Sequence, residues 1–88
     1  MDRRERIEAR LREAFAPLAL EVVDDSHRHR GHAGAASGGG HFRVRLVSER
    51  FRGVSRLARH RMVHEALASE LAGEIHALAL SARAPDEG

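Results

Sequence analysis

The chain has 88 residues, of which 42% are hydrophobic and 32% charged, and its formal net charge at pH 7 is +2. A chain of this length forms a single domain that buries about 60 to 65% of its unfolded surface, which excludes a large enclosed active site. The absence of cysteine excludes disulfides, a cysteine nucleophile and an iron–sulfur cluster bound by the chain's own thiolates. No apolar run approaches the roughly 18 residues of a membrane helix and the first residues are charged, so we expect a cytoplasmic protein that does not contact a membrane.

The first expected element is a helix from about Arg3 to Ala16. Asp2 and Glu5 have the spacing of a capping box, and apolar residues follow at helical intervals, namely Ile7, Leu11, Phe15 and Leu18. Pro17 should end this helix, because proline removes a backbone donor and disfavours helical geometry at the residue before it.

Two strands are expected next, on either side of a long connection. Residues 18–24 predict a strand whose inward side chains are Leu18, Leu20 and Val22. Residues 41–48 alternate more cleanly, with Phe42, Val44 and Leu46 on the core side and Arg43 and Arg45 in water.

The connection between these strands, residues 26–40, contains five glycines and three histidines. A loop of fifteen residues in so small a domain is usually functional or disordered. His27, His29 and His32 follow a His-x-His-x-x-His pattern, in which neutral imidazoles could meet a metal ion. The residues alone leave two interpretations open, a metal-binding loop and an unliganded, solvated loop.

Residues 50–80 predict a turn or short helix at Gly53, one long helix and a final strand. Ser55 is the expected N-cap. The apolar stripe of the helix comprises Leu57, Val63, Leu67 and Leu71 and includes His60 and His64, while the solvated side carries Arg61, Glu65 and Ala68. We expect Gly73 to end the helix with a positive φ, and we expect His60 to be a buried structural residue.

The final strand begins at Ile75, and its alternation places His76 on the side of Leu78 and Leu80. His76 is therefore either a metal ligand at the edge of the core or a core-edge histidine that is hydrogen-bonded to a backbone carbonyl. Residues 84–88 are expected to form a flexible tail.

These elements predict one α+β domain spanning residues 1–88, with a three-stranded sheet covered by helices on one face. Neither a Ser-His-Asp spacing nor a nucleotide-binding loop is present, so we expect a non-enzyme. All fifteen basic residues are arginines. Five of them could contact nucleic acid or a partner protein, or could simply be solvated surface charges. They are Arg59, Arg61, Arg56, Arg43 and Arg45.

Several blocks of the sequence resemble the BolA family in their order and spacing. They are Asp24-Asp25-Ser26-His27-Arg28-His29, His41-Phe42-Arg43-Val44, Phe51-x-Gly53, Arg59-His60-Arg61 and Ile75-His76-Ala77-Leu78. The likeness extends over roughly residues 7–85. It implies an α-β-β-α-α-β order with a type II KH-like fold. Gly31 and Gly34 spell the Gly-x-x-Gly of KH domains, but between two strands instead of two helices, which puts KH-type nucleic-acid binding in doubt.

The resemblance also implies a function and a ligand set. Family members share a [2Fe-2S] cluster with a monothiol glutaredoxin, in cluster trafficking or in iron and stress regulation, and the isolated chain binds no cluster. The histidine that matches the principal ligand is His76. The second ligand is His29 when the loop is aligned from Asp25 and His32 when it is counted back from His41, and His32 is favoured.

The partner's cysteine and glutathione would complete the cluster, and the chain alone would be a monomer or weak homodimer. A DNA-binding transcriptional regulator that uses the five arginines, also a role in this family, is the alternative. A metal-free interaction module is the third interpretation.

Overall fold

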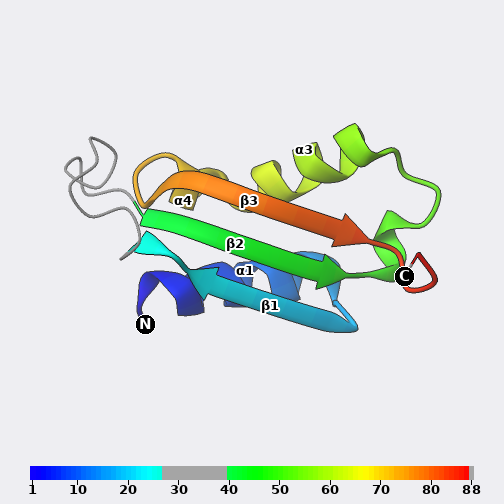
Figure 1. Ribbon diagram of the computed structural model, residues 1–88, viewed down its shortest axis with the longest axis horizontal. Coiled ribbons are helices and arrows are strands. Elements are labelled where there is room, and N and C mark those ends of the chain that lie inside the picture. The colour runs from blue at the N-terminus through cyan, green and yellow to red at the C-terminus, as the bar shows by residue number, and fades with distance from the viewer. Residues whose placement is uncertain (27–39, 88) are drawn as a thin grey trace.

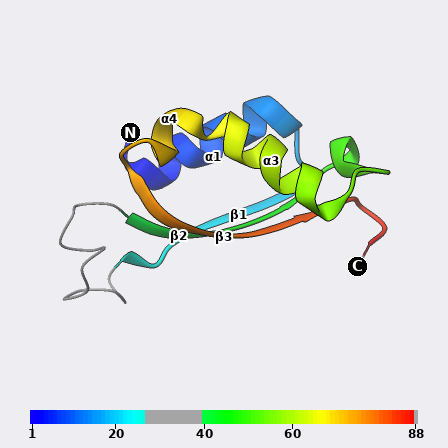
Figure 2. The ribbon, with the colours of Figure 1, turned by 90° about the horizontal axis from the view of Figure 1, so that it is seen from above.

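Helices and strands form two layers in the computed structural model, which describes residues 1–26 and 40–87. Figure 2 shows the α-helices on one face of the sheet; no helix of the described residues lies on the opposite face, which we call the uncovered face. The elements in chain order are α1 (Arg3–Phe15), β1 (Ala19–Asp24), β2 (Gly40–Val47), the short 3-10 helix η2 (Glu49–Phe51), α3 (Arg56–Ala66), α4 (Ala68–Leu71) and β3 (Ile75–Arg83). The predicted α+β architecture is confirmed.

The sheet has the order β1-β2-β3, with β2 in the centre (Figure 1). β2 pairs with β1 in antiparallel orientation and with β3 in parallel orientation, because α3 and α4 return the chain to the starting end of β2 before β3 begins. Consequently the first residues of β2 and β3 lie side by side at one end of the sheet. None of the helices within the described ranges is long and apolar enough to span a membrane.

The helix α1 follows the sequence-based prediction closely. Asp2 and Glu5 form the expected capping box, and the helix stops at Phe15 because Ala16 adopts a left-handed conformation with a φ of 44°. Ile7, Leu11 and Phe15 are buried. Leu18, however, was predicted to point inward and is 69% exposed, because it precedes β1 and lies in the connection between the two layers.

The core between helices and sheet consists of aliphatic side chains and three phenylalanines. On β2 the predicted alternation is confirmed, with Phe42, Val44 and Leu46 buried and Arg43 and Arg45 exposed. The rings of Phe15 and Phe51 lie 5.0 Å apart between centroids, and this contact joins the end of α1 to η2. The remaining buried core residues are Val22, Val63, Leu67 and Ile75.

The single long helix expected after Ser55 is divided into two. Ser55 caps α3 as predicted, but α3 ends at Ala66, and α4 begins only after Leu67. The inward face of α3 carries Val63, which is buried, and the half-buried Met62 and Ala66. Leu57 lies on the opposite side and is 61% exposed, so its assignment to the apolar stripe was wrong.

Two other predictions for this region are corrected. His64, placed in the apolar stripe, is exposed. Gly73 lies in the turn after α4 without the predicted positive φ, which among the described residues occurs only at Ala16 and Gly53. The turn is closed instead by hydrogen bonds from the N–H groups of Gly73 and Glu74 to the carbonyl of Glu70, so no left-handed residue is needed there.

Gly40 starts β2 in a position that leaves no room for a side chain. A Cβ atom there would lie 2.5 Å from Cε2 of Phe42 and 3.1 Å from Nη1 of Arg3. We expect Gly40→Ala to lower the free energy of unfolding by about 1 to 3 kcal/mol, because a buried phenylalanine would have to move. Urea denaturation measures this difference. Gly73→Ala is the control, since no atom lies within 4 Å of the place that its Cβ would occupy and its φ is not positive, and an equal loss in both variants would contradict the steric explanation.

Candidate functional site

His76 lies at the start of β3, where the pairing with β2 shifts by one residue. Gly40 pairs with Ile75 but His41 pairs with Ala77, so His76 is an extra residue between the two pairs. Ile75 is buried, Leu78 is half-buried and His76 is exposed. The prediction that His76 shares the side of Leu78 and Leu80 was therefore wrong, because a β-bulge interrupts the alternation on which it depended.

The ring of His76 lies beside that of His41, a residue that was not predicted as part of the site. The two ring centroids are 5.2 Å apart with an angle of 46° between the ring planes. The backbone of His41 is fixed on the β1 side, where its N–H donates to Oγ of Ser26 at 3.1 Å and its carbonyl accepts from the N–H of Asp25 at 2.7 Å. His76 thus packs against a ring that is anchored in the sheet, and it presents an exposed imidazole.

The histidines of the predicted metal-binding loop, His29 and His32, lie outside the described residues. The residues that flank this segment can be placed. Ser26 contacts His41, and the N–H of Gly40 donates to the carbonyl of Glu74 at 3.0 Å, one residue before β3. Both flanks of segment 27–39 therefore lie at the end of the sheet that carries His41 and His76.

Imidazole nitrogen is a ligand for transition metals when it is neutral. Within residues 1–26 and 40–87, no group of three or more His, Asp or Glu side chains is arranged to bind a metal ion. His76 and His41 by themselves would not complete a tetrahedral coordination sphere. The described residues provide one accessible metal ligand, the imidazole of His76, on a strand that pairs with β2.

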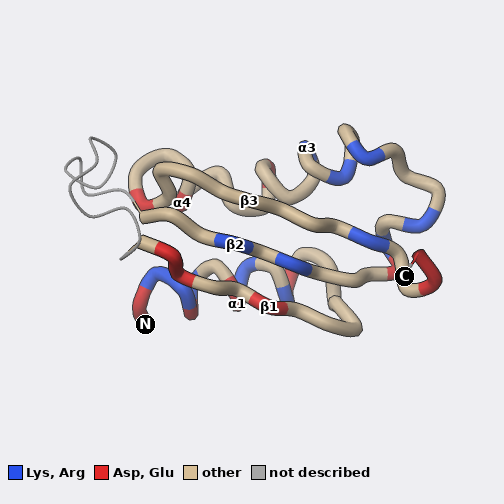
Figure 3. Tube along the Cα trace, in the orientation of Figure 1, with Lys and Arg blue, Asp and Glu red and all other residues tan. Residues whose placement is uncertain are grey.

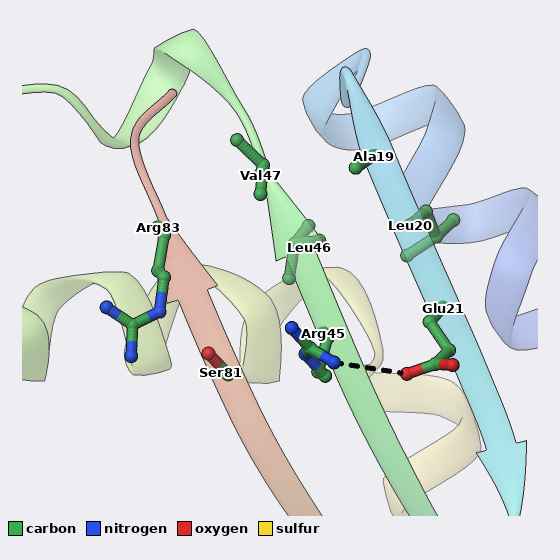
Figure 4. Close-up of a pocket in the computed structure, with 8 residues that line it drawn as sticks. All are labelled: Ala19, Leu20, Glu21, Arg45, Leu46, Val47, Ser81 and Arg83. Carbon is green, nitrogen blue, oxygen red and sulfur yellow. Dashed lines mark ion pairs between the residues drawn. The ribbon is translucent and has the colours of Figure 1, made fainter. Parts of the chain in front are cut away.

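The uncovered face of the sheet carries two of the predicted arginines. Arg43 donates from Nε to Asp25 at 2.8 Å, and Nη1 of Arg45 lies 3.8 Å from Oε1 of Glu21. Figure 4 shows the Arg45–Glu21 pair across β1 and β2, with Ser81 and Arg83 on the neighbouring strand. Both arginines are more than half exposed, and each has an acidic neighbour that lowers its attraction for an external anion.

Arg59, in contrast, is bound within the protein. Its guanidinium donates to the carbonyls of Val54 and Ala82, at 2.8 and 3.1 Å, and to both carboxylate oxygens of Glu87. Its side chain is only 11% exposed. The other two arginines of this group, Arg56 and Arg61, are exposed and form no ion pair with another described residue.

The segment after β3, residues 84–87, differs from the flexible tail that we expected. Ala84 is buried, its N–H donates to Glu87 at 3.0 Å, and Asp86 accepts from Arg52 at 2.8 Å. The bidentate contact of Glu87 with Arg59 adds to these bonds. Pairing with the side chains of Arg52, which follows η2, and Arg59 of α3 therefore holds this segment against the domain, although its composition predicted a flexible tail.

Glu87 should make the thermal stability of the folded protein depend on pH. The hydrogen bond from Arg59, followed by that from the backbone of Ala84, lowers the pKa of Glu87 from 4.5 to about 2. The pKa of Glu87 is lower in the folded protein than in the unfolded chain, so its ionised carboxylate stabilises the folded state. This contribution is complete above the unfolded-state pKa and is lost as the pH falls toward 2.

We therefore expect the melting temperature of Glu87→Gln to lie below that of the wild type at neutral pH, and we expect the gap to narrow in acid. Thermal melts of both proteins between about pH 7 and about pH 3 measure this gap. A gap of constant size over that range would show that ionisation of Glu87 is not its source.

His60 also differs from its prediction as a buried structural residue. It is half-buried and lines a hollow between α3 and β3, together with Arg56, Arg59 and Arg83. The reason is the position of α3, whose inward face is centred on Val63, so that His60 lies at the border of the helix–sheet contact.

Comparison with known proteins decides the family. The family model described as BolA-like protein matches residues 11–87. The chain belongs to the BolA family. The BolA resemblance deduced from the sequence blocks is thereby confirmed, over nearly the same residues.

Two relatives show the range of names within this family. The DNA-binding transcriptional regulator BolA of Escherichia coli K12 is 57% identical over 77 residues, which cover 88% of this chain and 70% of the relative. BolA-like protein 1 of the mouse is 52% identical over 79 residues, covering 90% of this chain and 56% of the relative. Neither name denotes an enzyme.

Solved BolA structures have the same fold. The BolA domain of SufE1 from Arabidopsis thaliana superimposes with a TM-score of 0.88 at 39% identity, covering 100% of this chain and 98% of that one. The solution structure of mouse BolA1 gives a TM-score of 0.76 at 50% identity, covering 93% of this chain and 64% of that one.

Proposed function

We propose that this BolA-family chain is a non-enzymatic adaptor that shares a [2Fe-2S] cluster with a monothiol glutaredoxin, in cluster trafficking or in iron and stress regulation. The observation that supports the proposal most is the exposed imidazole of His76. A β-bulge directs it out of the core, at the end of the sheet to which both flanks of segment 27–39 return.

The donor set of the chain fits a shared cluster better than a resident one. Irons of a [2Fe-2S] cluster are bound by thiolates or, in some centres, by imidazoles, and the chain has histidines but no cysteine. The chain would contribute His76 and one of His32 or His29, while the partner's cysteine and glutathione would contribute the thiolates. A cluster bound partly by neutral imidazole would be less negative than an all-thiolate cluster.

The role of the sheet in this proposal is to fix one ligand. β3 pairs with β2 along its length, and the His76 ring packs against His41, so His76 has few alternative positions. A ligand that is already oriented loses little conformational freedom on binding, which favours affinity. In this proposal, His76 at the β-bulge takes the place of a cysteine ligand that is held in position by the fold.

Mixing the chain with a cluster-loaded monothiol glutaredoxin and glutathione tests this function. We expect the visible absorption and circular dichroism to change on mixing, because imidazole replaces a thiolate at iron. The change should saturate at a defined stoichiometry. A spectrum equal to the sum of the separate components at all ratios would contradict the proposal.

A DNA-binding regulator remains the second candidate, because the Escherichia coli relative carries that name. Of the five arginines predicted to contact nucleic acid, Arg43, Arg45, Arg56 and Arg61 are exposed, whereas Arg59 is already bound to Glu87. Two of the four have acidic neighbours. This arrangement favours weak attraction to the phosphate backbone over readout of bases.

We expect binding to duplex DNA to be weak at physiological salt, to fall steeply as salt rises and to decrease in Arg61→Gln. Fluorescence anisotropy with a labelled duplex measures all three effects. A specific sequence bound with a Kd of about 10 nM, typical of a regulator, would make the DNA-binding function the better proposal.

A further inference from the structure

A hollow of about 340 Å³ lies between α3 and β3, at the opposite end of β3 from His76. Basic groups dominate its lining. The guanidinium groups of Arg56, Arg59 and Arg83 and the imidazole of His60 surround a single carboxylate, that of Glu87. Figure 3 shows the basic positions at the start of α3 and the acidic positions after β3 at the same end of the molecule.

The carboxylate of Glu87 identifies the chemistry that this hollow accepts. Arg59 binds it through two nitrogens, and the N–H of Ala84 donates a third hydrogen bond. The guanidinium is held in place by the carbonyls of Val54 and Ala82, so its orientation does not depend on Glu87 alone. A fixed, bidentate guanidinium is a built receptor for a carboxylate.

One carboxylate does not neutralise the lining. Among the described residues, Arg56 forms no ion pair, and Arg83 donates a hydrogen bond to the backbone carbonyl of Glu87 at 3.5 Å without forming a side-chain ion pair. The hollow therefore has a positive excess that a second or a replacing anion would reduce.

We propose that this hollow is a binding site for an acidic peptide segment of a partner protein, and that Glu87 is a built-in carboxylate which an aspartate or glutamate of the partner replaces on Arg59. The proposal does not depend on the shared cluster. The hollow contacts residues of β3, an outer strand of the sheet, and an extended peptide can hydrogen-bond to such an edge. No phenylalanine lines the hollow, and its one ring, the imidazole of His60, offers little surface for stacking of nucleic-acid bases.

Replacement of Glu87 is feasible because Glu87 lies at the surface. The side chains of Asp86 and Glu87 are 72% and 38% exposed, and Arg52 and Arg59 are their only side-chain ion-pair partners among the described residues. An internal competitor lowers the apparent affinity for an external ligand by the fraction of molecules whose site is occupied. Removing the charge of Glu87 should therefore strengthen peptide binding.

Fluorescence anisotropy with a fluorescein-labelled hexaglutamate peptide tests the site at low salt, with a hexaglutamine peptide as the uncharged control. We expect Glu87→Gln to bind hexaglutamate about threefold or more tightly than the wild type, and we expect Arg56→Gln to bind it about threefold or more weakly. Arg61→Gln is the matched control, because Arg61 is exposed on the same helix but does not line the hollow. It should change the affinity by less than about twofold.

Three outcomes would overturn the proposal. Equal losses in Arg56→Gln and Arg61→Gln would indicate attraction to the general charge of α3. Unchanged binding in Glu87→Gln would show that its carboxylate does not compete. Tighter binding of a single-stranded oligothymidylate than of hexaglutamate would assign the surface to nucleic acid. Should Glu87→Gln be unfolded at the assay temperature, the comparison of Arg56→Gln with Arg61→Gln decides the outcome.

Discussion

Replacing Phe51 by alanine is expected to lower the free energy of unfolding by about 3 to 5 kcal/mol, since a fully buried aromatic ring would leave a cavity. The ring is 0% exposed, lies 5.0 Å from that of Phe15 and has the guanidinium of Arg59 5.9 Å above it. Domains of this size are stable by only about 5 to 15 kcal/mol. Denaturation by urea, followed by far-ultraviolet circular dichroism, measures the loss.

Leu57→Ala is the matched control for this experiment. Leu57 is also a large apolar residue, but it is 61% exposed, so its removal should change the free energy of unfolding by no more than about 0.5 kcal/mol. A loss in Leu57→Ala comparable with that in Phe51→Ala would show that Leu57 lies on the buried face of α3, contrary to the structure described.

Features encoded by local spacing could be predicted from the sequence. The capping box at Asp2 and Glu5, the cap at Ser55 and the alternation of Phe42, Val44 and Leu46 are all confirmed. Each depends on residues a few positions apart, within one helix turn or one strand. The order and layering of the elements followed from these signals and from the family resemblance.

Features that depend on packing between elements could not be predicted in the same way. The break at Leu67 divides the expected long helix into α3 and α4, and the bulge at His76 changes which way the histidine points. Helical angles and strict alternation both assume uninterrupted elements. His41 was missed as a site residue because only the parallel pairing of β2 with β3 brings it beside His76.

The arginines show a similar limit. From the sequence, Arg59 and Arg61 were equivalent candidates for binding a partner. The structure separates them, because Arg59 bonds to Ala82 and Glu87, more than twenty residues further along the chain, while Arg61 remains exposed. Residue type predicts the chemistry of such a side chain, but not the partner that it finds in the fold.

The second prediction with a large effect concerns the proposed cluster ligands. His76→Ala should abolish the histidine-ligated spectrum of the mixed complex, because its β-bulge position provides the only fixed ligand in the proposal. His29→Ala or His32→Ala alone should weaken the spectrum, since a neighbouring histidine can substitute, and the double variant should be worse than either. Visible absorption after titration with the loaded partner measures the series.

A stronger loss in either single loop variant than in His76→Ala would reverse the assigned roles of the two ligand positions. His64→Ala serves as the control throughout. His64 is an exposed histidine on α3 and therefore tests whether removal of any surface imidazole affects the complex.

The most direct measurement is the visible circular dichroism of the complete complex, formed from the chain, a monothiol glutaredoxin, glutathione and the cluster. We predict that the bands which appear on mixing are retained in His64→Ala and lost in His76→Ala, while both variants keep the far-ultraviolet spectrum of the folded protein. If His76→Ala leaves the visible bands intact, the shared-cluster mechanism is wrong, and a metal-free interaction module becomes the better description of this protein.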